Sequence, residues 1–307
     1  MIMGSSSGRV VLFCLESHPL REKLCDQLGL EQGRLEFRRF PDGETYLRVD
    51  TPVSGARCIV LADLSNPDAR YLAHLFLFET LRELGASSVG LVAPYLCYMR
   101  QDRRFQDGEA VTSAVFARSL LRHIDWLITV DPHLHRYHAL GEIYSVPTQV
   151  VQGAPALAGW LRGQSDLLLV GPDAESEQWV ASIAQASSHP YVIGAKQRLG
   201  DRRVEVALPD ISRYQGRTAI IIDDVISSGR TVGECVKALR SQGMEAILCA
   251  AVHGIFAEAS DQYLLDTGLQ ALVTTNTIPH RTNGIDISEL LAPSIRHFLN
   301  QDRSKSR

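Results

Sequence analysis

Two adjacent carboxylates, Asp223 and Asp224, stand between an apolar run and a turn of small, hydroxyl-bearing residues. The apolar run at 219–222 predicts a strand buried on both faces, and the pattern at 231–242 predicts a helix. In an open α/β sheet, ligands bind beyond the carboxyl ends of the strands, and the N–H groups that open a helix suit a phosphate. Carboxylates suit sugar hydroxyls or a metal. The order of parts therefore indicates a sugar-phosphate site.

The turn between the carboxylates and the helix has the composition of a phosphate loop. Small side chains let the backbone approach a phosphate, and hydroxyls can donate to it. The alternative is an ordinary strand–helix junction with a serine N-cap, and the concentration of polar residues makes a ligand site the better interpretation. The turn consists of Ser227, Ser228, Gly229, Arg230 and Thr231.

Two loops in the first half of the chain are also rich in polar groups. The turn from Phe40 through Asp42 and Gly43 to Glu44 presents an aromatic ring and two carboxylates, although Pro-Asp-Gly is also a common hairpin turn. Residues 100–109 contain several arginines, whose forked donors suit polyphosphate, whereas such a run is more often a solvated surface.

Three further segments follow predicted strands. Asp131, His133 and His135 alternate and could bind a metal, although this spacing alone is weak evidence. Asp173 lies between an apolar strand and a helix. Lys196 lies in a predicted basic loop, and the chain has four lysines against 27 arginines, which hints at a specific task for it.

Composition is that of a soluble globular protein of two domains. The chain has 307 residues, 45% hydrophobic and 21% charged, with a net charge of −4. We therefore expect no nucleic-acid partner and, without an apolar run near ~18 residues, no membrane span. Six scattered cysteines without a CxxC pair favour buried thiols in a reducing compartment, and the amino terminus has no signal-peptide pattern, so we expect a cytoplasmic protein.

Strand and helix patterns alternate along the whole chain. This predicts an α/β fold with mainly parallel sheets flanked by helices. We expect a domain at 1–150 and another at 151–307, whose last helix can pack back on the first. Strands are predicted at 10–15, 58–64, 89–96, 126–130, 167–170, 191–194, 204–207, 219–222, 246–252 and 271–275, and a hairpin at 35–40 and 44–49. Helices are predicted at 19–28, 69–84, 111–123, 175–186, 231–242, 257–265 and 288–299.

The ordered set of these clusters resembles one family, the ribose-phosphate pyrophosphokinases. The Asp223 run alone resembles the ribose-phosphate loop of all type I phosphoribosyltransferases, whereas the segments at 98–103 and 130–133 are specific to the family. The resemblance implies two phosphoribosyltransferase-like domains, one on the ATP side and one on the ribose 5-phosphate side. It also implies Mg²⁺-dependent transfer of pyrophosphate from ATP to the 1-hydroxyl of ribose 5-phosphate, and a homo-oligomer based on a dimer.

The resemblance also implies a role for each matching residue. Lys196 and Arg198 would be catalytic, and His133 and Asp173 would hold Mg²⁺. ATP would bind to Phe40, Asp42, Gly43, Glu44, Arg100, Gln101 and Arg103. Ribose 5-phosphate would bind to Asp223, Asp224, Ser227, Ser228, Gly229, Arg230 and Thr231.

The chain departs from the family pattern at a few positions. Many members have two glycines where Glu175 and Ser176 stand, an aspartate in place of Ser227, and a glycine in place of Arg230.

Two rival functions are weighed against this one. A phosphoribosyltransferase that consumes phosphoribosyl pyrophosphate would leave the Phe40 turn and Lys196 without a task. A non-catalytic subunit associated with a synthetase would be expected to lose the metal and cationic residues, which are present here. No GxxxxGK[ST] run occurs, which excludes a P-loop as the way ATP is held.

Overall fold

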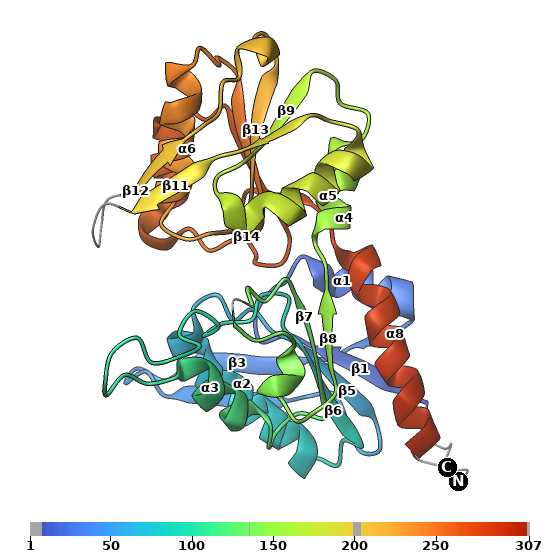
Figure 1. Ribbon diagram of the computed structural model, residues 1–307. Helices are drawn as coiled ribbons and strands as arrows, with labels where there is room; N and C mark the ends of the chain where they lie inside the picture. The colour runs from blue at the N-terminus through green and yellow to red at the C-terminus, as the bar shows by residue number, and fades with distance from the viewer. Residues whose placement is uncertain (1–7, 135, 199–203, 306–307) are drawn as a thin grey trace. The chain divides into compact units, whose positions relative to one another are not determined.

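The computed structural model describes residues 8–134, 136–198 and 204–305 (Figure 1). The chain divides into two compact units. Unit 1 comprises Met1–Val151 and Ser288–Arg307, and unit 2 comprises Gln152–Ile287. The last helix thus belongs to unit 1, although its sequence follows unit 2.

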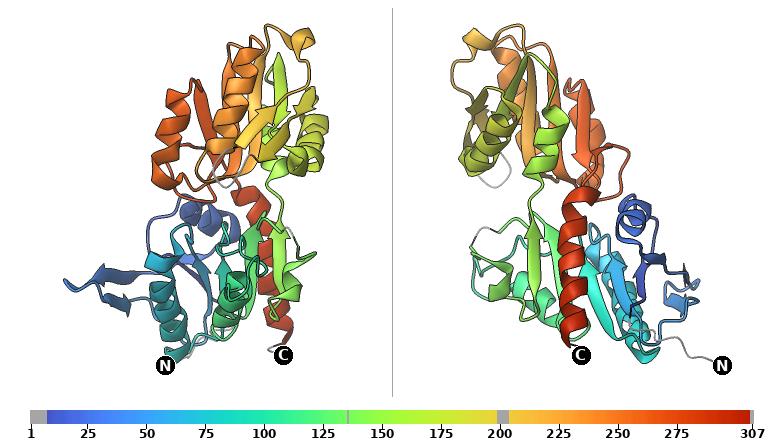
Figure 2. Two further views of the ribbon diagram at one scale, coloured as in Figure 1. Left: turned by 60° about the vertical axis from the view of Figure 1, so that its left-hand side comes forward. Right: turned by 90° about the vertical axis from the view of Figure 1, so that its right-hand side faces the viewer.

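Unit 1 is built on a six-stranded parallel sheet. The central strands are mostly apolar and are buried along their whole length, as expected for a sheet covered on both faces. An antiparallel hairpin, β3 (Leu35–Arg39) and β4 (Thr45–Val49), stands out from the sheet (Figure 2). In spatial order the sheet contains β2 (Glu31–Gln32), β1 (Val10–Phe13), β5 (Arg57–Leu61), β6 (Ser88–Val92), β7 (Trp126–Val130) and β8 (Thr148–Val151).

Helices cover both faces of this sheet (Figure 1). On one face, α2 (Pro67–Glu83) and α3 (Thr112–Leu120) pack in a core with β1 and β5. On the other, α1 (Leu20–Leu28) contacts α8 (Ser288–Lys305). The Trp126 and Phe298 rings stack at 5.1 Å between centroids, and Arg57 donates to the Leu299 carbonyl. These contacts hold α8 on unit 1.

Unit 2 repeats this plan. Its parallel sheet has one face packed against α6 (Arg230–Ser241) and α7 (Ser260–Asp266), and α4 (Ala154–Leu161) and α5 (Glu177–Ser187) lie together on the other. A second hairpin pairs β11 (Ala195–Arg198) with β12 (Val204–Ala207). In spatial order the sheet contains β10 (Tyr191–Ile193), β9 (Leu167–Gly171), β13 (Thr218–Ile226), β14 (Ile247–Gly254), β15 (Ala271–Thr275) and β16 (Asn283–Ile285).

The two sheets have the same strand order, and this places a crevice in each. In unit 1 the chain leaves β1 toward β2 on one side and leaves β5 toward β6 on the other. In unit 2 it leaves β9 toward β10 and β13 toward β14 in the same way. Ligands of open α/β sheets bind at the carboxyl ends of the two strands where the direction reverses. These points lie between β1 and β5 and between β9 and β13.

The expected fold class is confirmed, and several elements differ from expectation. β2, β8, β11, β16 and α4 were not predicted. β2 is two exposed polar residues, and α4 contains Pro155 and Gly159, which are poor helix formers except that proline is favoured at a helix start. The helix expected at 257–265 is a 3₁₀ turn, Ala257–Ala259, followed by α7.

Two features expected from composition can be compared with the structure. All six cysteines are free and buried. Within residues 8–134, 136–198 and 204–305, no helix combines the length and apolarity that crossing a bilayer requires.

Candidate active site

The strand that carries Asp223 and Asp224 is longer than expected. β13 extends to Ile226 because β14 continues beside it, with Asp223 opposite Ala251 and Ile226 opposite Gly254. The carboxylates therefore lie within the last part of a paired strand, not beyond its end. Pairing with β14 gives both side chains a rigid backbone support.

Asp223 lies in a strongly acidic environment. Loss of hydration around its half-buried carboxyl group raises its pKa well above the ordinary value, and the charges of Asp224 and Asp173 raise it further. Asp173 follows β9 and Asp223 belongs to β13, so the fold brings together carboxylates that are 50 residues apart. This acidic group occupies the strand-reversal point of unit 2, where a cation or a set of hydroxyl donors would relieve the repulsion.

The turn after β13 is shaped by a glycine that no other residue can replace without strain. Gly229 has φ +69°, and a Cβ there would lie 3.0 Å from Cγ of Leu264. The Ser260 hydroxyl donates to the Ser227 carbonyl at 2.6 Å, which anchors the start of the turn to α7. The Gly233 N–H then donates to the Gly229 carbonyl at 2.8 Å as the first bond of α6.

The predicted phosphate-binding residues lie around the opening of α6. Ser228 and Arg230 are exposed, and Ser227 and Thr231 are half-buried. α6 has 12 residues and begins at Arg230, so the positive end of its dipole and its first N–H groups lie at this turn. The geometry is that of an anion site directly beside the Asp223 group.

Ser176, at a position where the resemblance implies a glycine, has a structural role. Its N–H donates to Oδ1 of Asp173 at 3.3 Å, and its Oγ donates to the Asp173 carbonyl at 2.6 Å. These bonds close the 3₁₀ turn Ala174–Ser176 and orient the Asp173 carboxylate. The neighbouring Glu175 is exposed. The departure from glycine therefore leaves Asp173 held in place.

Lys196 and Arg198 do not lie in a loop. They belong to β11, where Lys196 is opposite Val206 and Arg198 is opposite Val204. The expectation of a loop was wrong. Residues 196–198 are all polar and show no strand pattern of their own, whereas apolar residues alternate in the partner strand, at Val204 and Val206. The hairpin sits between β10 and β13 along the chain, so it belongs to the unit that contains Asp223.

In unit 1, the Phe40 turn is the exposed tip of the β3–β4 hairpin. The Gly43 N–H donates to the Phe40 carbonyl at 2.9 Å, and the Glu44 N–H donates to Oδ1 of Asp42 at 3.2 Å. Gly43 has φ +93°, which explains the glycine. The Phe40 side chain is 39% exposed. An aromatic face and two carboxylates are thus presented to an external ligand or another protein surface.

Two residues that support this tip were missed in the sequence. Tyr46 lies edge-on to Phe40, with 6.0 Å between ring centroids, and the Arg38 guanidinium lies 4.8 Å from the Phe40 ring and 4.1 Å from the Tyr46 ring. Arg38 and Tyr46 are opposite each other in the hairpin register. Cross-strand pairing, once the hairpin is assumed, is the signal that could have identified them.

The arginine-rich segment after β6 is anchored at one buried acid. Asp102 accepts from Arg136 at 2.7 Å, and its carbonyl accepts from the Tyr137 hydroxyl at 3.2 Å. Arg103 is exposed and its guanidinium lies 4.9 Å from the Phe105 ring. Arg100 is exposed and Gln101 half-buried. The side chains of Arg100 and Arg103 are therefore at the surface, whereas the backbone of the segment is held by the bonds that Asp102 makes.

His133 follows β7 in an unusual conformation. Its φ is +54°, and that of Asp131 is +34°, which are rare values for non-glycine residues and frequent at functional sites. His135 lies outside the described residues. Among the residues that the structure describes, no three His, Cys, Asp or Glu side chains are grouped so that they could hold a metal ion. Because His135 lies outside the described residues, the metal site at Asp131, His133 and His135 stays a prediction.

These features define a class of protein. Both units have a doubly wound parallel sheet, and unit 2 has carboxylates and a small-residue turn at its strand-reversal point. This is the arrangement of the phosphoribosyltransferase-like proteins, present here as two fused units.

Comparison with known proteins identifies the family. Residues 10–123 match the N-terminal domain of ribose phosphate pyrophosphokinase, and residues 204–306 match the phosphoribosyl synthetase-associated domain. The Methanopyrus kandleri ribose-phosphate pyrophosphokinase is 31% identical over 94% of this chain and 99% of its own length. That of Sulfolobus acidocaldarius is 31% identical over 89% and 96%. The chain belongs to the ribose-phosphate pyrophosphokinase family.

A solved structure supports the fold. The phosphoribosylpyrophosphate synthetase of Mycobacterium smegmatis aligns with a TM-score of 0.80 and 24% identity, over 95% of this chain and 99% of that one. At this identity the likeness concerns the fold.

Proposed function

We propose that this enzyme transfers the β,γ-pyrophosphoryl group of ATP to the 1-hydroxyl of ribose 5-phosphate, giving phosphoribosyl pyrophosphate and AMP. The observation that carries the proposal is the arrangement between β9 and β13. Carboxylates suited to ribose hydroxyls lie beside a helix opening suited to a phosphate, in a chain that belongs to the pyrophosphokinase family.

Ribose 5-phosphate would bind entirely to unit 2. Its phosphate would accept from the N–H groups and hydroxyls of Ser227, Ser228, Gly229 and Thr231, with Arg230 at the rim. Its 2- and 3-hydroxyls would donate to Asp223 and Asp224. These donors would offset the loss of hydration and the repulsion that together raise the pKa of Asp223.

ATP would bind to unit 1. The Phe40 ring would stack on the adenine, and Asp42, Gly43 and Glu44 would contact its polar edge. Arg100, Gln101 and Arg103 would bind the phosphates, since guanidinium groups offer paired donors. The exposure of the hairpin tip and of Arg103 is consistent with such a role.

The described residues offer few side chains that could bind Mg²⁺. Asp173 and His133 are the candidate ligands, and carboxylates suit this cation better than imidazoles. Because no group of three such side chains occurs in the described residues, the triphosphate and water would supply most ligands. When bound, the ion would neutralise charge on the transferred group.

For the transfer itself, the chain would position the two substrates and supply positive charge. The 1-hydroxyl oxygen attacks the β-phosphorus, and the bond from that phosphorus to the oxygen bridging to the α-phosphate breaks. The hydroxyl proton passes to solvent and AMP leaves. Lys196 and Arg198 would stabilise negative charge on the transferred oxygens, and one such preorganised group is typically worth ~10²–10³ in rate.

The two rival functions are less well supported. The named relatives match along nearly the whole chain, which a single-domain phosphoribosyltransferase would not. A non-catalytic subunit would not need Asp173, Asp223 and Lys196 together. We also propose a cytoplasmic location, which free buried thiols favour, and a homo-oligomer.

The direct test is an assay with ATP, Mg²⁺ and ribose 5-phosphate. AMP should appear in step with phosphoribosyl pyrophosphate, and a chelator should stop both. Stoichiometric ADP would exclude pyrophosphoryl transfer, and turnover that survives the chelator would exclude the metal.

A further inference from the structure

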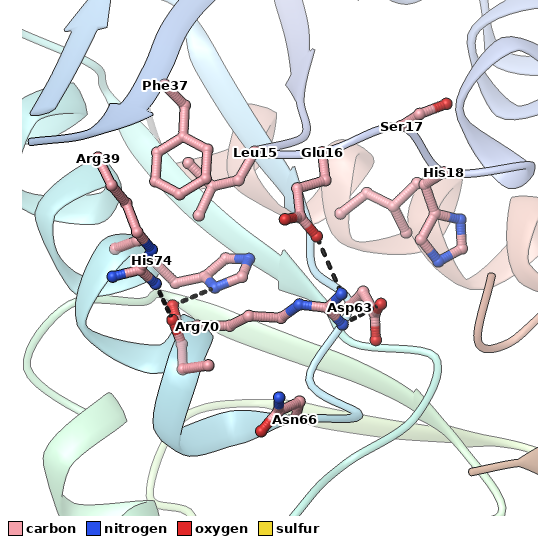
Figure 3. Close-up of a pocket in the computed structure, with 13 residues that line it drawn as sticks. Leu15, Glu16, Ser17, His18, Phe37, Arg39, Asp63, Asn66, Arg70 and His74 are labelled. Atoms are coloured by element: carbon pink, nitrogen blue, oxygen red, sulfur yellow. Dashed lines mark hydrogen bonds and ion pairs between the residues drawn. The ribbon is translucent and has the colours of Figure 1, made fainter. Parts of the chain in front are cut away.

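Unit 1 contains a cavity at the position that corresponds to the sugar-phosphate site of unit 2. The cavity has a volume of about 270 Å³ (Figure 3). Its walls are the loop after β1, the loop from β5 into α2, and the β3–β4 hairpin. The site of unit 2 has two matching parts, the loop after β9 and the loop from β13 into α6.

The strand registers make this correspondence exact at two acids. Phe13 of β1 is paired with Val60 of β5, and Val170 of β9 is paired with Ile221 of β13. Three positions beyond these pairs stand Glu16 and Asp63 in unit 1, and Asp173 and Asp224 in unit 2. Both units therefore place carboxylates at the same two positions of the strand-reversal point.

In unit 1, an arginine from α2 organises the two acids. Arg70 donates to Asp63, and its other terminal nitrogen lies 3.0 Å from Glu16. Asp63 also accepts from the Ser65 N–H at 2.9 Å, so Asp63 is an anchor. The Glu16 side chain is 51% exposed and is held through one oxygen only. Glu16 therefore retains acceptor capacity toward the cavity.

His74 adds a second acceptor. Its side chain is buried, and Nδ1 lies 2.9 Å from the Arg70 carbonyl, which can only accept, so Nδ1 carries the proton. Burial lowers the pKa of His74 to about 4, so the ring is neutral at physiological pH and Nε2 is a lone-pair acceptor. In Figure 3 this nitrogen faces the cavity on the side of Glu16. Within the described residues Nε2 has no hydrogen-bond partner.

The remaining lining suits a small polyhydroxylated ring. Phe37 and Leu15 form an apolar wall, and the exposed Asn66 amide can both donate and accept. The phosphate loop of unit 2 has no counterpart here, because α2 begins at Pro67 and only three residues separate it from Asp63. The two arginines of the lining, Arg39 and Arg70, balance the two acids. A ligand is therefore recognised by hydroxyl groups rather than by a phosphate.

We propose that this cavity is a second sugar site, in which a pentose donates hydroxyl hydrogen bonds to Glu16 and to Nε2 of His74. The assignment rests on the proposed function, since that function makes the acids of unit 2 a ribose site. The pentose can be a free sugar or the sugar of a phosphorylated compound, and both are offered in the test.

The test is equilibrium dialysis of the full chain with Mg²⁺ and without ATP, using labelled ribose and labelled ribose 5-phosphate. Wild type should bind two molecules of ribose 5-phosphate per chain. Glu16→Ala and Ala69→Leu, which fills the cavity, should each retain one. Thr231→Glu, which puts a negative charge at the α6 opening, should also retain one. Ribose affinity should fall about tenfold or more in Glu16→Ala and partly in Glu16→Gln.

The control is Glu22→Ala, which removes an exposed acid of α1 outside the cavity and should change neither stoichiometry nor ribose affinity. Nitrogen-15 histidine spectra should show the unprotonated Nε2 signal of His74 shifting with ribose in wild type and Glu22→Ala only. Binding of a single ribose 5-phosphate that Thr231→Glu abolishes and Glu16→Ala leaves intact would overturn the inference while supporting the proposed function. The reverse pattern would place the sugar in unit 1 and contradict the function proposed for unit 2.

Discussion

At the scale of single residues, the carboxylates of the proposed site repel one another. Asp223 is dehydrated and lies near the charges of Asp224 and Asp173, and its pKa is raised in consequence. A group whose folded-state pKa lies above its unfolded value destabilises the folded protein as pH rises between the two values. The site is therefore less stable without a ligand at neutral pH than in acid.

This argument predicts that Asp223→Asn stabilises the ligand-free protein. At pH 7 the free energy of unfolding should rise by about 1 kcal/mol or more, since a shift of one pKa unit corresponds to about 1.4 kcal/mol. The gain should shrink as pH falls through the raised pKa and vanish well below the unfolded-state value of 3.8, where the wild-type carboxyl group is protonated in both states. Denaturant unfolding across this pH range measures the effect, and ribose 5-phosphate turnover should be lost.

Asp266→Asn is the matched control, because Asp266 is an exposed acid of the same unit. Its unfolding free energy should follow that of wild type at every pH. An Asp223→Asn protein less stable than wild type at pH 7 would mean that neighbouring groups stabilise the ionised Asp223 carboxylate and do not repel it.

At the scale of elements, the turn between β13 and α6 depends on close packing against α7. Gly229 combines a left-handed backbone with a Cβ position that Leu264 would contact at 3.0, 3.2 and 3.3 Å. Any side chain there is strained by the left-handed backbone and must displace either Leu264 or the turn whose N–H groups are proposed to bind phosphate.

Gly229→Ala should therefore reduce both stability and affinity. We expect a loss of about 1–3 kcal/mol in unfolding free energy and a rise of the KM for ribose 5-phosphate by about tenfold. Gly216→Ala separates the two causes, since Gly216 has φ +82° but no atom within 4 Å of its Cβ position. That control should lose stability through the backbone alone and keep its KM. Equal KM values in the two variants would show that the turn does not contact the sugar phosphate.

The β11–β12 hairpin predicts a separation of binding from turnover. Lys196→Ala should lower kcat by at least ~10² and leave ribose 5-phosphate binding nearly unchanged, because the lysine is proposed to act on charge that develops during transfer. Single-turnover kinetics and dialysis measure the two quantities. Lys237→Ala, which removes an exposed lysine paired with Glu234 on α6, is the control and should behave as wild type. A Lys196→Ala enzyme with normal kcat would remove this residue from the mechanism.

At the scale of the whole molecule, the exposed hairpin tip of unit 1 suggests assembly. Phe40 is 39% exposed although it belongs to a proposed ligand site. A neighbouring copy related by a two-fold axis would cover such a tip.

We therefore expect a homo-oligomer based on a two-fold dimer. Sedimentation at assay concentrations should show a dimer or a multiple of it. If the ATP site is shared, a mixture of inactive Phe40→Ala and Lys196→Ala chains should recover part of the activity after subunit exchange, since some sites would combine the intact residues of both. A fully active monomer would contradict the prediction.

Local patterns in the sequence were sufficient for the fold class and for much of the candidate site. Apolar runs such as Trp126–Val130 and Leu167–Gly171 are buried strands in the structure because burial on both faces of a parallel sheet requires mostly apolar side chains. The Gly229 turn could be recognised because helix openings and left-handed glycines have local chemical signatures.

Only the tertiary structure decided what depends on pairing between distant segments. The extension of β13 to Ile226 follows from β14, the strand character of Lys196 follows from β12, and the placement of Asp173 beside Asp223 follows from β9 lying next to β13. The Glu16 cavity likewise exists because β1 and β5 are neighbours. Apart from the β11–β12 hairpin, these contacts join residues far apart in sequence, and in every case the partner strand, not the periodicity of the segment itself, decides the structure.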